Sequence, residues 1–237
     1  MSGHSHWSTI KRKKEAKDHE KGKLFSQASK EIMLAISQGG GQTDPDKNVR
    51  LRAAIERTKE INMPKDNIDR IMKRVTEKQE HVSEVVYEAL GPGNSSFVIK
   101  TVTDNSRRTQ TSLKVILDKN GGKLVAKGTI MHGYDLCGMF EIEGYSEAEV
   151  LKLIEAIQAF DFETINHTYF VYVPYSILSE AWQKAREMGF KKAPELIYKP
   201  KNLIRLDEKQ VQKVISLAER IEELEDTQQV FMNVDLS

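Results

Sequence analysis

Apolar side chains recur every three or four residues through the first third of the chain, a pattern that is typical of amphipathic helices. The first predicted helix, about Leu24 to Gln38, ends at a run of three glycines. Asp44-Pro45 predicts the N-cap and first position of a second helix, which continues to about Asn62. A third apolar stripe follows Pro64. We therefore expect residues 24–78 to form a small helical domain.

Beyond a polar linker at 79–84, short apolar runs alternate with helical stretches. The first group predicts two strands, a helix and a third strand, at 85–90, 97–103, 105–117 and 123–131. From about Gly138 the pattern predicts strand, helix, two strands, helix and strand, which is the split βαβ or ferredoxin-like order. These six elements are expected at 139–143, 147–160, 162–166, 168–173, 177–188 and 195–198.

The last two predicted elements, a helix at 208–224 and a strand at 229–234, have no partner in the completed ferredoxin-like unit. A separate domain of so few residues could hardly bury a core. The earlier group, in turn, lacks a second helix to cover its sheet. We therefore predict an α+β protein with a helical N-terminal domain followed by two sandwich-like α/β domains. The last of the three domains is ferredoxin-like and is inserted into the middle one. The predicted divisions are 1–80 for a basic arm and the helical domain, 82–135 with 201–237 for the discontinuous domain, and 136–200 for the insertion.

Composition excludes several classes of protein. The mean hydropathy is −0.52, and the sequence has no run of 18 apolar residues, which is about the length needed to cross a membrane. The first 30 residues are rich in lysine and have no apolar stretch of the kind found in secretory signals. Cys137 is the only cysteine, so no intrachain disulfide is expected and a reducing compartment, the cytoplasm, fits best.

Charge is divided unequally along the chain. Residues 1–80 hold 18 Lys and Arg against 12 Asp and Glu, whereas residues 81–237 hold 18 against 23. Seven cations fall within 13 residues of a basic arm with little apolar content, a spacing suited to the phosphates of a nucleic acid. The alternative is a solvated tail. The arm cations are Lys11, Arg12, Lys13, Lys14, Lys17, Lys21 and Lys23.

Two further groups of cations extend this surface. Arg50, Arg52 and Arg57 lie on the second predicted helix, opposite its apolar stripe, where they either join the basic surface or are only solvated. Arg107 and Arg108 fall in the first turn of the helix that Asp104 or Asn105 can cap. The helix dipole disfavours cations there, so the pair predicts either an anion site or salt bridges to a neighbouring domain.

Catalytic and metal-binding motifs are lacking in the sequence. The glycine run at 39–41 is not followed by the Lys and Ser or Thr of a phosphate-binding loop. The histidines and the single cysteine have no zinc-ligand spacing, and no nucleophile lies at motif spacing from a base. We expect no enzyme activity, no metal and no cofactor.

Several motifs in one order resemble the YebC family. They include Ser2-Gly3-His4-Ser5-His6-Trp7, Lys21-Gly22-Lys23-Leu24-Phe25, Asn62-Met63-Pro64-Lys65-Asp66, Thr103-Asp104-Asn105 and Leu224-Glu225-Asp226. The resemblance implies a cytoplasmic protein with a helical domain and two α/β domains, and no enzyme activity. Bacterial members are described as DNA-binding transcriptional regulators, and other members act in translation on the ribosome.

The sequence and the resemblance together predict a non-enzymatic regulator of gene expression that binds DNA through the basic arm and the helical domain. A ribosome-associated translation factor that contacts RNA is the alternative, and an enzyme that uses an inter-domain cleft is a remote one. No membrane partner and no small-molecule substrate are expected.

Overall fold

The computed structural model describes residues 18–78 and 82–236, and side chains at 18–21 and 78 fall outside the description. Its first unit consists of three helices, α2 (Asp18–Gln38), α3 (Val49–Glu60) and α4 (Lys65–Lys78). Their apolar faces meet in one core, in which Ile32, Ile36 and Leu51 are almost fully buried. The three predicted helices are therefore present.

The predicted start of the second helix is wrong, because Asn48 caps α3 instead of Asp44. The Asn48 side chain accepts a hydrogen bond from the Leu51 amide at 3.1 Å and donates to the Ala35 and Gln42 carbonyls, both at 3.0 Å. It can reach across to α2 only because residue 39 is glycine: a Cβ there would lie 2.3 Å from the Asn48 amide nitrogen. The Asn48 side chain thus joins α3 to α2, and this contact decides where α3 begins in spite of the local preference of Asp44-Pro45 for a helix start.

The first sheet has the strand order β3-β1-β2-β8 and is antiparallel throughout. Its last strand, β8, comes from the end of the chain and pairs with β2, so that Phe97 lies opposite Met232. Helices α5 and α8 cover one face with Leu113, Leu117 and Leu217. The bounds are β1 (Ser83–Leu90), β2 (Ser96–Thr103), α5 (Ser106–Lys119), β3 (Lys123–Val125), α8 (Glu208–Glu222) and β8 (Thr227–Met232).

The second sheet has the order β5-β6-β4-β7, again antiparallel. Its chain order βαββαβ is the one predicted for the ferredoxin-like unit. Helix α6 begins with a capping box, in which Ser146 and Glu149 bond reciprocally. The bounds are β4 (Tyr134–Ile142), α6 (Glu147–Ala156), β5 (Asp161–Ile165), β6 (Thr168–Pro174), α7 (Leu178–Glu187) and β7 (Glu195–Pro200).

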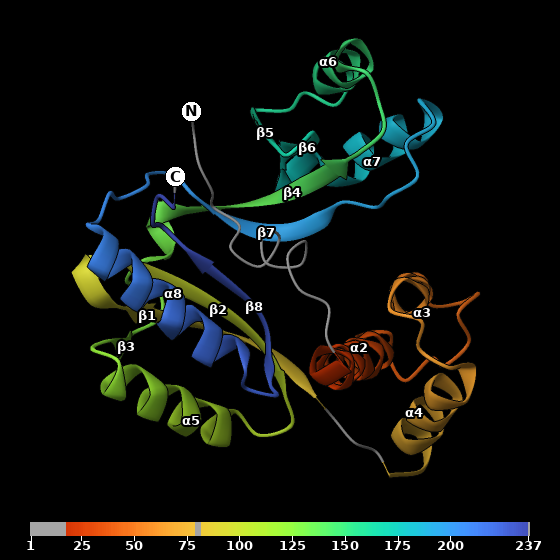
Figure 1. The fold of residues 1–237 in the computed structure, drawn as a ribbon. Helices are drawn as coiled ribbons and strands as arrows, with labels where there is room; N and C mark the ends of the chain where they lie inside the picture. The colour runs from red at the N-terminus through yellow and green to blue at the C-terminus, as the bar shows by residue number, and fades with distance from the viewer. Residues whose placement is uncertain (1–17, 79–81, 237) are drawn as a thin grey trace.

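The two sheets pack face to face (Figure 1). Val98 and Phe231 of the first sheet share a core with Met139 and Tyr172 of the second, and Phe231 stacks edge-on against Tyr198. The helices α6 and α7 cover the outer face of the second sheet, as α5 and α8 cover that of the first. The order of layers is therefore helices, sheet, sheet, helices. The mixed α and β fold is confirmed; the pairing of β2 with β8 agrees with a discontinuous domain, whose boundaries stay a prediction.

The strand predicted at 123–131 is shorter than expected and ends at Val125. A buried carboxylate takes over the amides that a longer strand would have paired. Glu88 accepts hydrogen bonds from the amides of Gly128, Ile130 and Met131, at 2.5, 2.8 and 3.1 Å. This loop folds around a side chain of β1 instead of extending the sheet. Of the helices in the described ranges, none is long and apolar enough to cross a membrane.

Candidate nucleic-acid interface

Most of the basic arm lies outside the described residues. This applies to Lys11, Arg12, Lys13, Lys14 and Lys17, and nothing follows from the structure about their contacts. Helix α2 begins at Asp18, earlier than predicted, so the last two arm cations, Lys21 and Lys23, stand on its first turns. Lys23 is half-buried there. The arm therefore leads directly into the longest helix of the helical domain.

The three arginines of α3 make contacts within the helical domain. Arg50 donates to the Gln38 side chain and Arg57 pairs with Glu31 at 3.6 Å, so both reach back to α2. Arg52 instead bonds the turn before α3, where it lies 3.3 Å from the Asp46 carboxylate. The side chains of Arg52 and Arg57 remain about half exposed, at 47% and 50%. The structure brings Arg50 and Arg57 to one side of α3 and Arg52 to another.

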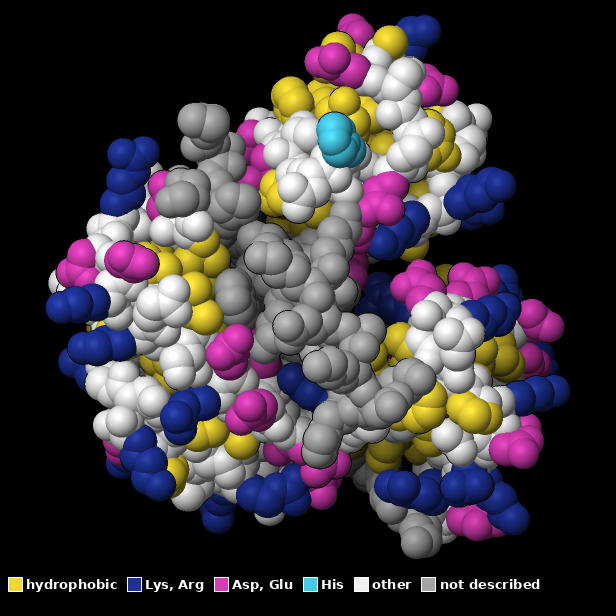
Figure 2. Space-filling model, in the orientation of Figure 1, with side chains coloured by type: hydrophobic (Ala, Val, Ile, Leu, Met, Phe, Trp, Pro, Cys, Tyr) yellow, Lys and Arg dark blue, Asp and Glu magenta, His cyan; other side chains and the backbone are white. Residues whose placement is uncertain are grey.

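Charge of both signs is spread over the face of the molecule in Figure 2. Lys and Arg side chains lie over the helical domain as well as over the sheets, and Asp and Glu side chains stand between them. Some Lys and Arg side chains lie next to one another along the lower edge of the helical domain, and carboxylates border them. Elsewhere on this face the two signs alternate.

Arg107 and Arg108 are neighbours in sequence with different surroundings. Asn105 is the N-cap of α5, and its side chain accepts a hydrogen bond from the Arg108 amide at 3.1 Å. The Arg108 guanidinium bonds Asp104 and lies 3.6 Å from Asp226, and the bond to Asp104 is the main cause that raises its pKa. Arg107 is exposed, and no ion pair joins its guanidinium to another described residue. The ion pairs of Arg108 lie within its own unit and not to a neighbouring domain, while Arg107 has no ion pair with a described residue; an anion site at this pair stays a prediction.

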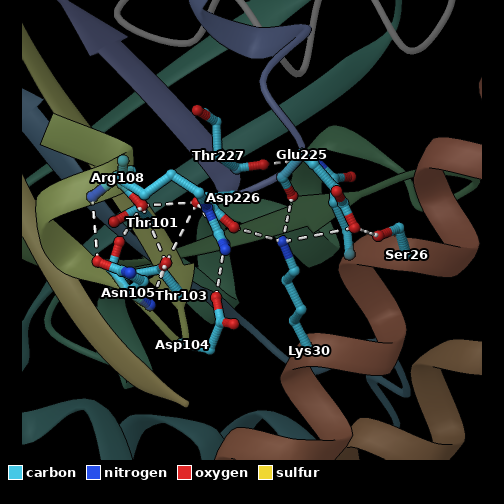
Figure 3. A network of polar contacts seen from close by, with 12 residues as sticks. Ser26, Lys30, Thr101, Thr103, Asp104, Asn105, Arg108, Glu225, Asp226 and Thr227 are labelled. Carbon is cyan, nitrogen blue, oxygen red and sulfur yellow. Dashed lines mark hydrogen bonds and ion pairs between the residues drawn. The ribbon is translucent and has the colours of Figure 1, made fainter. Parts of the chain in front are cut away.

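Asp226 is the residue that sequence reasoning missed. It lies in the turn between α8 and β8, its side chain is 11% exposed, and four side chains converge on its carboxylate (Figure 3). Lys30 of α2 approaches one oxygen at 2.7 Å. The hydroxyls of Thr109 and Thr103 donate to the other oxygen at 2.6 and 3.2 Å, and Arg108 lies on the same side. The only signal in the sequence was the Leu224-Glu225-Asp226 motif.

These donors keep Asp226 ionised although it is buried. Burial by itself raises the pKa of a carboxyl group, because it penalises the charged form. The hydrogen bonds from Lys30, Thr109 and Thr103, together with the charge of Lys30, outweigh that effect and lower the pKa of Asp226 below its ordinary value of 3.8. The contact is a charge-assisted network that holds three parts of the chain together.

A cleft of about 670 Å³ opens beside this network, between the helical domain and the first sheet. It is lined by α2, by α4, by the β2–α5 junction and by the turn before β8. Its charged residues are Lys30, Arg74, Arg108, Asp104 and Glu225, so cations and carboxylates are nearly balanced. In the part of the chain that is described, no three His, Cys, Asp or Glu side chains lie where they could hold a metal ion together.

Comparison with known proteins gives the same picture along the whole chain. Residues 5–78 match the family model described as the TACO1/YebC protein N-terminal domain, and residues 82–234 match the model of the TACO1/YebC second and third domain. A "probable transcriptional regulatory protein" of Dictyoglomus turgidum is 40% identical over all of this chain and 96% of its own length. One from Fervidobacterium nodosum is 36% identical over all of this chain and 94% of its own length.

A crystal structure agrees with these matches. A conserved hypothetical protein of Aquifex aeolicus superposes with a TM-score of 0.85 at 34% identity, over 97% of this chain and 96% of that one. The resemblance found from the sequence motifs is confirmed by whole-length similarity in both sequence and structure. The chain belongs to the TACO1/YebC family, whose curated relatives are named as probable transcriptional regulators.

Proposed function

We propose that the protein is a non-enzymatic regulator of gene expression that binds DNA, and that the basic arm supplies its main contacts to phosphate. The density of cations in the arm is the observation that supports this most, with seven in 13 residues. Such contacts release counterions from the nucleic acid and give affinity that does not depend on sequence. The names of the relatives, as probable transcriptional regulatory proteins, point to the same class of partner.

Beyond the arm, Arg107 is the described cation best suited to a second contact. It is exposed at the start of α5, where it has no carboxylate partner among described residues. Arg52 and Arg57 are half exposed, and all three arginines of α3 are already bonded within the domain. Their contribution is therefore expected to be smaller than that of the arm. Binding, and not catalysis, is the role proposed for the whole surface.

The test is a salt titration of the affinity for duplex DNA. In the test variant, Lys11, Arg12, Lys13 and Lys14 are all replaced by glutamine. If all four residues touch phosphates, the slope of log affinity against log salt should fall by about 3.6 units on duplex DNA and by about 2.8 on a single strand. Identical slopes for the two proteins would contradict the proposal and leave the arm as a solvated tail.

A matched control removes four cations elsewhere. Lys114, Lys191, Lys209 and Lys213 are exposed on the sheet domains, and their replacement by glutamine changes net charge by the same amount. This control should keep the wild-type slope. Titration on single-stranded RNA and co-sedimentation with ribosomes separate the two kinds of target. A slope change on RNA alone, with ribosome binding that depends on the arm, would favour the translation factor over the DNA-binding regulator.

A further inference from the structure

The helical domain is docked onto one turn of the first sheet. Three side chains of α2 reach the turn between α8 and β8. Ser26 donates to the Glu225 side chain at 3.2 Å, and Gln27 donates to the Thr227 carbonyl at 2.8 Å. Lys30 donates to the Glu225 carbonyl at 2.8 Å and to the Asp226 carboxylate at 2.7 Å. Among these groups, only Lys30 and Asp226 form an ion pair with both side chains largely buried, at 14% and 11% exposure.

The same carboxylate also holds the start of α5. Thr103 at the end of β2 and Thr109 in the first turn of α5 both donate to Asp226, and Arg108 lies beside them (Figure 3). The Asp226 carbonyl accepts the Val102 amide at 2.9 Å, which fixes the turn itself against β2. One side chain therefore bonds α2 on one side and the helix that carries Arg107 on the other.

An anion-binding role for this place fits the charges poorly. Lys30 and Arg108, which line the cleft, are both engaged by Asp226, and Asp104 and Glu225 add negative charge to the same walls. A phosphate would have to compete for these cations with the buried Asp226 carboxylate and with the exposed carboxylates of Asp104 and Glu225. The arrangement suits a joint that holds two parts of the molecule better than it suits a pocket for a phosphate.

We propose that Asp226 is a positioning residue for nucleic-acid binding: through Lys30 it holds α2, the helix that carries the last arm cations Lys21 and Lys23, at a fixed place relative to Arg107. Lys30 stands 12 residues after Asp18, so at 1.5 Å per residue the start of α2 lies about 18 Å along the helix from the joint. Two contact sites on one rigid frame bind one ligand more tightly than two that move independently, because the second contact forms at high effective concentration. This inference rests on the proposed function.

Replacing Asp226 by asparagine separates positioning from charge. Asp226→Asn removes a negative charge, so a purely electrostatic role predicts tighter binding to duplex DNA. The positioning role predicts the opposite, a loss of about tenfold, because the two contact sites become independent of each other. Lys30→Met breaks the same ion pair while leaving Asp226 bonded to Thr103 and Thr109, so the first sheet keeps its polar contacts. Both variants should bind a duplex of about 30 base pairs, three helical turns, more weakly than the wild type.

Two control variants test whether binding depends on the contact between α2 and the turn before β8. Glu31→Gln removes an ion pair from the same helix, but that pair joins α2 to Arg57 within the helical domain, so binding should not weaken. In an Arg107→Ala background the second contact is already absent, and Asp226→Asn should cause little further loss. An equal loss in both backgrounds would show that the two residues act independently and would overturn the proposal.

The joint itself is measured without any nucleic acid. Spin labels on Glu60→Cys and Asp118→Cys, both exposed, report the distance between α3 and α5, while Cys137 is buried. Asp226→Asn and Lys30→Met should broaden this distance distribution. An unchanged distribution would overturn the proposal, and so would a broader one with unchanged affinity. If wild type binds no DNA or RNA, the proposed function fails, and the distances still show whether the joint exists.

Discussion

The two sheets have the same design and are assembled differently. Each has four antiparallel strands with two helices on its outer face. The second sheet is built from one continuous stretch between Tyr134 and Pro200. The first sheet also needs β8, which pairs with β2 but follows the whole second unit in the sequence. Contacts between residues far apart in sequence close large loops and form slowly. The first sheet is therefore the one that depends on the rest of the molecule.

The largest effect expected from this difference follows deletion of residues 205–237. The deletion removes α8 and β8 from the first sheet, so β2 loses a neighbour and the core around Leu113 loses a helix. Amide hydrogen exchange should show loss of protection across β1 and β2, while the helix-covered side of the second sheet stays protected. Unchanged protection across β1 and β2 would contradict the dependence on β8.

Residues in the seam between the sheets should affect both of them. Phe231 is fully buried and packs against residues of the second sheet, so Phe231→Ala should cost about 3–5 kcal/mol and lower protection in both units. Leu153 of α6 is equally buried but lies in the helix-covered core of the second unit alone. Leu153→Ala should cost about 2–5 kcal/mol, with the loss of protection concentrated in that unit.

Acid should weaken the joint at Asp226. Since the pKa of this carboxyl group is lowered in the folded protein, its contribution is complete above its ordinary value of 3.8 and is lost as the pH falls through the lower folded value. The stability advantage of wild type over Asp226→Asn should therefore be constant near neutral pH and shrink below about pH 4. Urea unfolding of both proteins at several pH values measures this, and a constant difference down to pH 2 would be inconsistent with it.

The smallest effect concerns the helix starts of the two units. Helix α6 begins with Glu147 and Glu149, which suit the helix dipole, while α5 begins with Arg107 and Arg108. Arg107→Glu should stabilise the first unit by no more than about 1 kcal/mol and weaken DNA binding. Thermal unfolding and a binding titration of the same variant check both parts. A loss of stability would mean that Arg107 has a structural role after all.

Periodicity predicted the number and order of most helices and strands because each buries one face. It failed where a side chain from elsewhere decided the local structure. Asn48 caps α3 because it also bonds α2, and Glu88 ends β3 early by taking the amides of the following loop. Asp226 could not be found in this way, since its partners Lys30 and Thr109 lie 196 and 117 residues away. Local pattern carries no information on contacts of that range, whereas the family motif marked the residue without explaining it.

The position of Cys137 gives the molecule a built-in reporter. Its thiol lies in the seam between the two sheets, and burial raises its pKa to about 12, so in the folded protein it is both inaccessible and almost wholly in the unreactive thiol form. Because the thiol is buried between the sheets, it can be alkylated only when the sheets part. It is also the only cysteine in the chain, so any alkylation of a cysteine reports on this position. The rate at which Cys137 is alkylated therefore measures how often the two sheets separate. Mass spectrometry of the intact protein can follow this rate without any substitution in the chain.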